Sequence, residues 1–102
     1  MTFLSSPEKN MHILSQAEVT AHLSTRPDWQ IETGELARTF QFETFRDAVA
    51  FVNRVADLAE EAGHHPDIDI RYNRVRLALI SHDAGGLTTK DFAVAAGADK
   101  LL

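Results

Sequence analysis

The chain has 102 residues, a formal net charge of −5, 44% hydrophobic and 25% charged residues, and no cysteine. This composition excludes disulfides and cysteine metal ligands, and the acidic balance argues against a nucleic-acid partner, because phosphate contacts need clustered Lys and Arg. No apolar run approaches the ~20 residues of a membrane span, and the N-terminus lacks a secretory signal, so we expect no membrane partner and a cytoplasmic location.

Three helix starts follow a loose lead-in at residues 1–12, within what we expect to be a single domain over residues 1–102. Each start is a Ser or Thr three residues before an acidic residue, which is the pattern of a capping box. The three pairs are Ser15 with Glu18, Thr44 with Asp47, and Thr88 with Asp91.

The middle helix is predicted over residues 44–62, because its apolar residues recur at spacings of three and four. Gly63 fits the position after a helix where a positive φ is needed. The predicted buried face consists of Phe45, Ala48, Val49, Val52, Val55, Ala56 and Ala59, widened by Phe51, Leu58 and Ala62.

Two hairpins flank this helix. Residues 29–31 and 36–42 surround the polar segment ETGE, and apolar and polar residues alternate over 68–72 and 75–79, around Asn73-Arg74. Hairpins separated by a helix favour an α+β fold, a two-layer domain with a four-stranded antiparallel sheet packed on helices. The predicted order is α-β-β-α-β-β-α.

The second hairpin brings histidines together in this prediction. A symmetric hairpin about Asn73-Arg74 pairs the apolar residues of its two strands on one face. The same register places His65 opposite His82, and a slip of one residue places His64 there instead. We therefore expect these histidines at one end of the hairpin.

Clustered histidines suit acid/base chemistry, because imidazole titrates near neutral pH and can both accept and donate a proton. A metal site of His and Asp is an alternative, although adjacent histidines in an extended segment point to opposite faces. The segment DAGG, residues 83–86, precedes a helix as phosphate-binding loops do. It lacks the GxxxxGK[ST] pattern, so a plain turn is favoured. His12 and His22 are isolated, and we expect ordinary surface or capping roles for them.

A longer pattern, E-x3-HHP-x5-Y-x9-H-x8-D, connects these residues to a known family. It is present as Glu60, His64, His65, Pro66, Tyr72, His82 and Asp91. Together with the surrounding string HHPDIDIRYNRVRLALISHDAGGLTTKDF, it resembles the pterin-4a-carbinolamine dehydratase family, also known as the dimerisation cofactor of a homeodomain transcription factor. The resemblance covers roughly residues 15–98.

The resemblance implies dehydration of 4a-hydroxytetrahydropterin to quinonoid dihydropterin, which recycles the cofactor of aromatic amino acid hydroxylases. It implies no metal or organic cofactor, a homodimer or homotetramer, and an aromatic amino acid hydroxylase as a possible protein partner. The alternative is a non-catalytic, protein-binding member of the same fold, acting as a transcriptional coactivator, a hydroxylase partner or an assembly factor for another enzyme.

The resemblance also assigns the site. His64 and His82 are expected to transfer protons, and His65 to bind and orient the pterin. The other expected substrate-binding residues are Glu60, Pro66, Ser81 and Asp83. Ile68 stands where many members carry an aromatic residue, and Ser81 where Thr is common.

Overall fold

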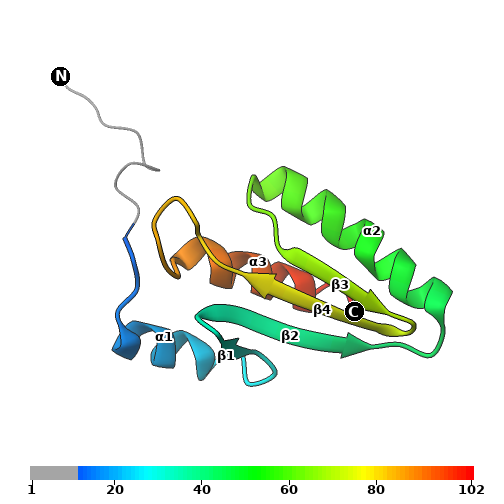
Figure 1. Ribbon diagram of the computed structural model, residues 1–102, viewed down its shortest axis with the longest axis horizontal. Coiled ribbons are helices and arrows are strands. Elements are labelled where there is room, and N and C mark those ends of the chain that lie inside the picture. Colours follow the sequence, from blue (N-terminus) through cyan, green and yellow to red (C-terminus); the bar gives the residue numbers. More distant parts are fainter. Residues whose placement is uncertain (1–11) are drawn as a thin grey trace.

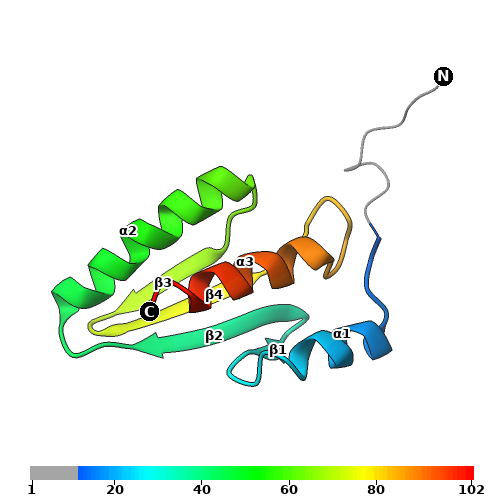
Figure 2. The ribbon, with the colours of Figure 1, turned by 180° about the vertical axis from the view of Figure 1, so that it is seen from behind.

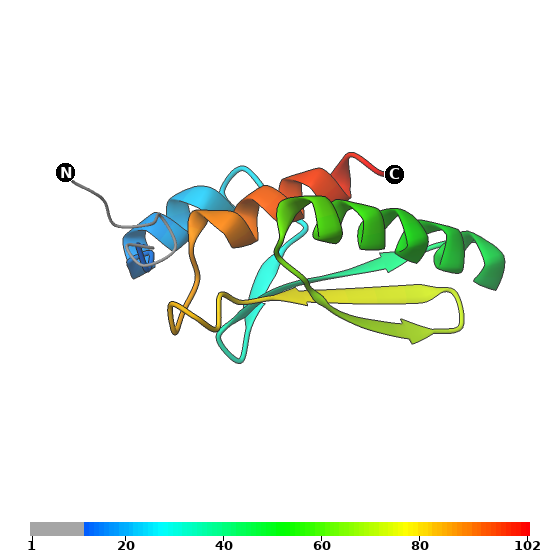
Figure 3. The ribbon, with the colours of Figure 1, turned by 90° about the horizontal axis from the view of Figure 1, so that it is seen from above.

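A computed structural model describes residues 12–102, so most of the predicted lead-in lies outside the described residues. A four-stranded antiparallel sheet forms one layer, and three helices cover one of its faces (Figure 1, Figure 3). This architecture and its order α-β-β-α-β-β-α confirm the predicted fold class. Within the described residues, no helix is both long and apolar enough to cross a membrane. The elements are α1 Gln16–Leu23, β1 Gln30–Glu32, β2 Glu35–Gln41, α2 Phe45–Ala62, β3 Asp67–Arg71, β4 Arg74–Leu79 and α3 Thr89–Asp99.

All three helices begin where the capping pattern predicts. The Ser15 hydroxyl accepts the backbone N–H of Glu18 at 3.1 Å, and the Glu18 carboxylate accepts the backbone N–H of Ser15 at 2.8 Å. The start of α3 has the same reciprocal pair. At α2 the Thr44 hydroxyl accepts the backbone N–H of Asp47. These bonds satisfy amides that the helix itself leaves without partners.

The sheet has the strand order β1-β2-β4-β3. β1 and β2 join through Thr33 and Gly34, whose φ values are 49° and 82°. Two successive positive φ values are the requirement of a type I′ turn, so the polar segment ETGE forms a tight hairpin as expected.

The second hairpin turns at Tyr72 and Asn73, one residue earlier than predicted, so the predicted register is wrong. Ile70 lies opposite Val75 rather than Leu77. The sequence pattern favours Asn73 as the first turn residue, because Asn adopts a positive φ readily, but it is Tyr72 that has a φ of 53°. The pairing shifts by two residues, so the apolar side chains stay on the same face.

α2 buries a narrower stripe than its apolar pattern predicts. Phe45 is 50% exposed, and Ala56 and Ala62 are also exposed, so their predicted burial is wrong. The sheet and α3 pack against only part of the helix surface, which leaves these side chains outside the core. The buried residues of α2 are Ala48, Phe51, Val55 and Ala59.

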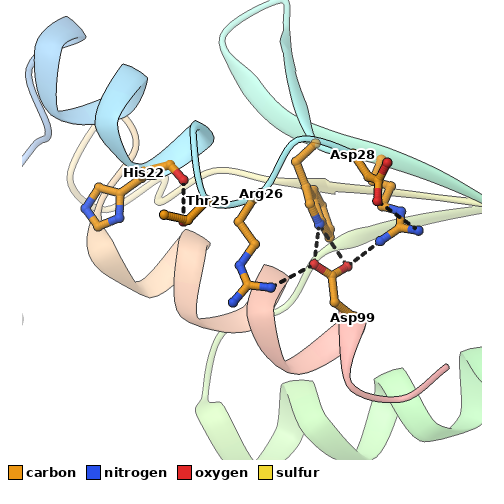
Figure 4. A network of polar contacts seen from close by, with 7 residues as sticks. His22, Thr25, Arg26, Asp28 and Asp99 are labelled. Atoms are coloured by element: carbon orange, nitrogen blue, oxygen red, sulfur yellow. Dashed lines mark hydrogen bonds and ion pairs between the residues drawn. The ribbon is translucent and has the colours of Figure 1, made fainter.

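The C-terminal end of α3 is held by a single carboxylate. α3 lies on the helix side of the sheet, between α1 and α2 (Figure 2). Asp99, at its end, accepts the indole N–H of Trp29 at 2.9 Å. It also accepts guanidinium N–H groups from Arg26 at 3.2 Å and from Arg38 at 2.7 Å (Figure 4). This network joins α3 to the segment after α1 and to β2.

Candidate active site

An open hollow of about 200 Å³ lies where the end of α2 meets the end of β4. The three histidines of the HHP and SHD segments all line it, so the structure brings them together. Lys90, for which the sequence predicts no role, also lines it. The polar side chains around the hollow are His64, His65, Ser81, His82, Asp83 and Lys90.

Two local features place the histidines. α2 ends at Gly63 with φ at 63°, and the backbone N–H of His64 then bonds to the carbonyl of Ala59 at 3.2 Å. Glycine reaches this left-handed conformation without a steric penalty, so the chain turns sharply into the histidine pair. On the other side, a bridge between Ser81 and Gly86 closes the loop that carries His82.

His64 is fixed by a buried carboxylate. Its Nε2 lies 2.6 Å from Oδ1 of Asp91, whose side chain is fully buried. Asp91 also accepts the Ser81 hydroxyl and the backbone N–H of Thr88, both at 2.9 Å. An ionised carboxylate can only accept hydrogen bonds, so the Nε2–H of His64 donates to it. Nδ1 is then the ring nitrogen available to accept a proton.

Asp91 is part of the family pattern in the sequence, but that pattern predicts no role in the site for it. Its place in a capping box already explained it as a helix-start residue. The structure shows that the same carboxylate caps α3 and binds His64. The spacing between His64 and Asp91 cannot be read as a contact from the sequence, because the helix cap alone accounts for an acidic residue at position 91.

The other two histidines are more exposed. His65 pairs with Glu60 through Nε2 and Oε2 at 2.5 Å, and these side chains are 60% and 78% exposed. His82 is exposed in the loop after β4. The hollow therefore combines one rigidly held imidazole with two that are open to solvent.

Only two of the four predicted substrate-binding residues line the hollow. Asp83 and Ser81 line the hollow. Glu60 does not line it but pairs with His65, which does. The Ser81 hydroxyl is buried and bonds to Thr88 as well as to Asp91, so the protein itself engages it. Pro66 is buried and is not among the residues that line the hollow.

The loop at residues 83–86 is a turn rather than a phosphate-binding loop. The backbone N–H groups of Ala84, Gly85 and Gly86 bond to the Ser81 carbonyl at 3.0–3.3 Å, as in a plain turn. Within residues 12–102, no three histidine or acidic side chains are grouped to hold a metal ion. His22 stacks on the ring of Phe92, with centroids 4.7 Å apart, and belongs to the contact between α1 and α3.

Comparison with known proteins identifies close sequence relatives. A family model described as pterin 4 alpha carbinolamine dehydratase matches residues 12–101. A Chloroflexus aggregans protein, provisionally named a pterin-4-alpha-carbinolamine dehydratase, is 64% identical over 90 residues, which cover 87% of this chain and 96% of that protein. A Roseiflexus castenholzii protein of the same provisional name is 50% identical over 90 residues, covering 88% and 97%.

Solved structures with the same fold carry more varied descriptions. A transcriptional coactivator/pterin dehydratase from Brucella melitensis superposes with a TM-score of 0.84 at 29% identity, covering 88% of this chain and 98% of that one. A pterin dehydratase-like protein, described as a RuBisCO assembly factor in the alpha-carboxysome, has a TM-score of 0.59 at 30% identity, covering 72% and 84%. On the family match and these identities, the chain belongs to the pterin 4 alpha carbinolamine dehydratase family.

Proposed function

We propose that this chain dehydrates 4a-hydroxytetrahydropterin to quinonoid dihydropterin by histidine acid/base catalysis. Membership of the family supports the reaction class. The observation that carries the proposal is that His64, His65 and His82 line one hollow, with His64 held by the buried Asp91. Aromatic amino acid hydroxylases produce such a carbinolamine, so the reaction would regenerate their cofactor.

The reaction needs two proton transfers and no co-reactant. The C4a–O bond breaks while the hydroxyl takes a proton and leaves as water. N5 loses its proton, and its electron pair forms the C4a–N5 double bond of the quinonoid product. A positioned acid or base contributes about 10²–10⁴-fold to such a step. Two imidazoles can supply both functions near neutral pH.

Within this proposal, His64 and His82 are the proton-transfer pair. Asp91 is a positioning residue, because it fixes the ring orientation and tautomer of His64 and stabilises the imidazolium that forms. His65, braced by Glu60, binds and orients the pterin from the rim, and Asp83 offers a carboxylate to the polar edge of the ring.

Two residues act indirectly in this proposal. The Ser81 hydroxyl donates to Asp91, so we assign it to holding that carboxylate rather than to touching substrate. Pro66 follows the histidine pair and is buried, which suits a role in fixing the loop.

The proposal includes a homodimer or homotetramer, an aromatic amino acid hydroxylase as the supplier of substrate, and a cytoplasmic location. One surface supports assembly. Phe45 is 50% exposed and borders a surface hollow of about 380 Å³, whose other lining residues are Arg46, Val49, Ala50 and Asn53 of α2. Aromatic and arginine side chains are both enriched in protein–protein interfaces.

Replacing Phe45 tests the assembly. Wild-type protein should sediment as two or four chains, and Phe45→Ser should shift the mass downwards because an aromatic contact is lost. Ile13→Ser is a matched control, since Ile13 is similarly exposed, at 49%, but is not among the residues that border this hollow. A monomeric wild type, or an unchanged mass for Phe45→Ser, would contradict the role of this surface.

A second candidate function is protein binding without catalysis. One solved structure favours it, since it is described as a pterin dehydratase-like RuBisCO assembly factor. The other is described both as a transcriptional coactivator and as a pterin dehydratase, which fits either function. The Phe45 surface would suit such a partner as well as a second copy of the chain. This role does not require the three histidines.

An assay of dehydration separates the two functions. A separate hydroxylase generates the 4a-hydroxytetrahydropterin, and the rise of quinonoid dihydropterin is followed with and without this chain. We expect acceleration that is insensitive to EDTA. A folded protein that gives no acceleration would favour the protein-binding function, and a loss of activity that zinc restores would favour a metal site.

A further inference from the structure

A second hollow, of about 150 Å³, adjoins the candidate active site. It lies between α2 and α3, and it shares two of its lining residues, His64 and Lys90, with the histidine hollow. Its remaining lining is entirely hydrocarbon. These residues are Leu58, Ala62, Ala93 and Val94.

The floor of this apolar hollow is fixed by helix packing. α3 approaches α2 closely at Gly97, where a Cβ atom would lie 2.9 Å from Cδ1 of Leu58. Val94 is buried, whereas Ala62 and Ala93 are exposed at the rim. The small side chains of Ala62 and Ala93 leave the hollow open beside His64, and the packed helices close it below.

The size of the two hollows suggests that a ligand uses both. Small-molecule sites generally have volumes of about 300–1,000 Å³ and mostly apolar walls. The histidine hollow alone falls below this range, and its lining is largely polar. With the adjoining apolar hollow, the combined space reaches the lower end of the range.

We propose that the apolar hollow is a subsite for the substituent on C6 of the pterin, an inference that rests on the proposed dehydratase function. C6 is bonded to N5, the atom that loses its proton, so a C6 substituent begins one atom away from the reacting nitrogen. His64, the proposed proton-transfer residue, borders both hollows. A pterin with N5 at His64 therefore has its C6 substituent beside the apolar hollow.

The subsite selects pterins with a short aliphatic substituent at C6. Two additional methylenes buried in such a hollow favour a substrate by about 15-fold. We therefore expect kcat/KM for a 6-propyl carbinolamine to exceed that for a 6-methyl carbinolamine by about this factor.

Filling the hollow tests the proposal. Ala93→Leu and, independently, Ala62→Leu place extra carbon atoms in the space from two different helices. In each variant the propyl-to-methyl ratio of kcat/KM should fall from about 15 to near 1. Ala17→Leu, at an exposed alanine of α1 outside both hollows, is the matched control and should keep the wild-type ratio.

The outcomes separate the subsite from the reaction itself. A wild-type ratio near 1, or a ratio that both filling variants leave unchanged, would overturn the subsite while leaving the dehydratase activity established. A wild type that accelerates neither substrate would overturn the proposed function, and the subsite with it.

Discussion

At the scale of single residues, the defining feature is the contact between His64 and Asp91. The carboxylate is fully buried and accepts from an imidazole, a hydroxyl and a backbone amide. A buried charge is stable only when such partners surround it. One side chain therefore caps α3 and fixes the imidazole that we propose as a catalytic group.

The substitution Asp91→Asn tests whether Asp91 supports catalysis through His64 in addition to stabilising the fold. The amide keeps the shape but presents an N–H₂ group to donors, so we expect the free energy of unfolding to fall by about 1–3 kcal/mol. Because His64 loses its acceptor, kcat/KM should fall about 10–100-fold, mainly in kcat, with a changed pH profile. Kinetics and urea denaturation measure these effects.

Asp47→Asn is the matched control for that substitution. Asp47 occupies the equivalent position in the first turn of α2 but is exposed. The Asp47→Asn substitution should therefore have little effect on kcat/KM. An Asp91→Asn variant with wild-type kcat/KM and an unchanged pH profile would show that Asp91 serves only the helix cap.

At the scale of elements, helix caps define where the helices begin, and the cap of α1 is sensitive to pH. The backbone N–H of Ser15, and after it the His12 side chain, lower the pKa of Glu18 from its ordinary 4.5 to about 2. The pKa is lower in the folded state, so ionised Glu18 stabilises the fold above about pH 4.5. This contribution is lost as the pH falls towards 2.

Glu18→Gln should remove that pH dependence. Glutamine can still accept the Ser15 amide, so the cap geometry survives without the charge. We expect wild type to have the higher Tm at pH 5, and the difference in Tm to shrink as the pH approaches 2. Thermal melts across this range measure it. A constant difference in Tm from pH 5 to pH 2 would contradict the assignment.

At the scale of the whole molecule, the Asp99 network anchors the end of α3 that is opposite the candidate site (Figure 4). The side chain of Asp99 is only 17% exposed. Asp99→Ala should lower the free energy of unfolding by about 2–4 kcal/mol, because two guanidinium groups and an indole lose their acceptor. Activity per folded molecule should change little.

Asp28→Ala is the control for the network. Asp28 lies 3.7 Å from Arg38 but is 71% exposed. Exposed pairs of this kind contribute about 0–1 kcal/mol, so urea denaturation should show only a small change. Equal effects of the two substitutions would contradict the central position of Asp99.

The sequence predicts most of this fold, because local signals specify its elements. The capping pairs mark the helix starts, Gly63 marks the end of α2, and alternation marks the strands. The hairpin register could not be read correctly, because nothing local signals that Tyr72 adopts a positive φ. The histidines still converge, because His64 and His65 directly precede β3 and His82 follows β4, so all three lie at the same end of the hairpin whichever register it has.

Two residues of the site escaped prediction for different physical reasons. Asp91 had a sufficient local role as a cap, and its contact with His64 spans 27 residues of sequence. Lys90 lies in the first turn of α3, where the helix dipole disfavours a cation. That local conflict beside a histidine motif was the available signal, since such conflicts tend to mark functional sites.

The most direct test of histidine catalysis in this protein is the kcat/KM of His64→Ala for dehydration of 4a-hydroxytetrahydropterin, relative to wild type. His12→Ala is the control, because His12 pairs with Glu18 at the start of α1 and should leave the activity intact. We predict a fall of about 100-fold or more for His64→Ala, the scale of a lost general acid or base. Wild-type activity in a folded His64→Ala protein would contradict histidine catalysis at this site.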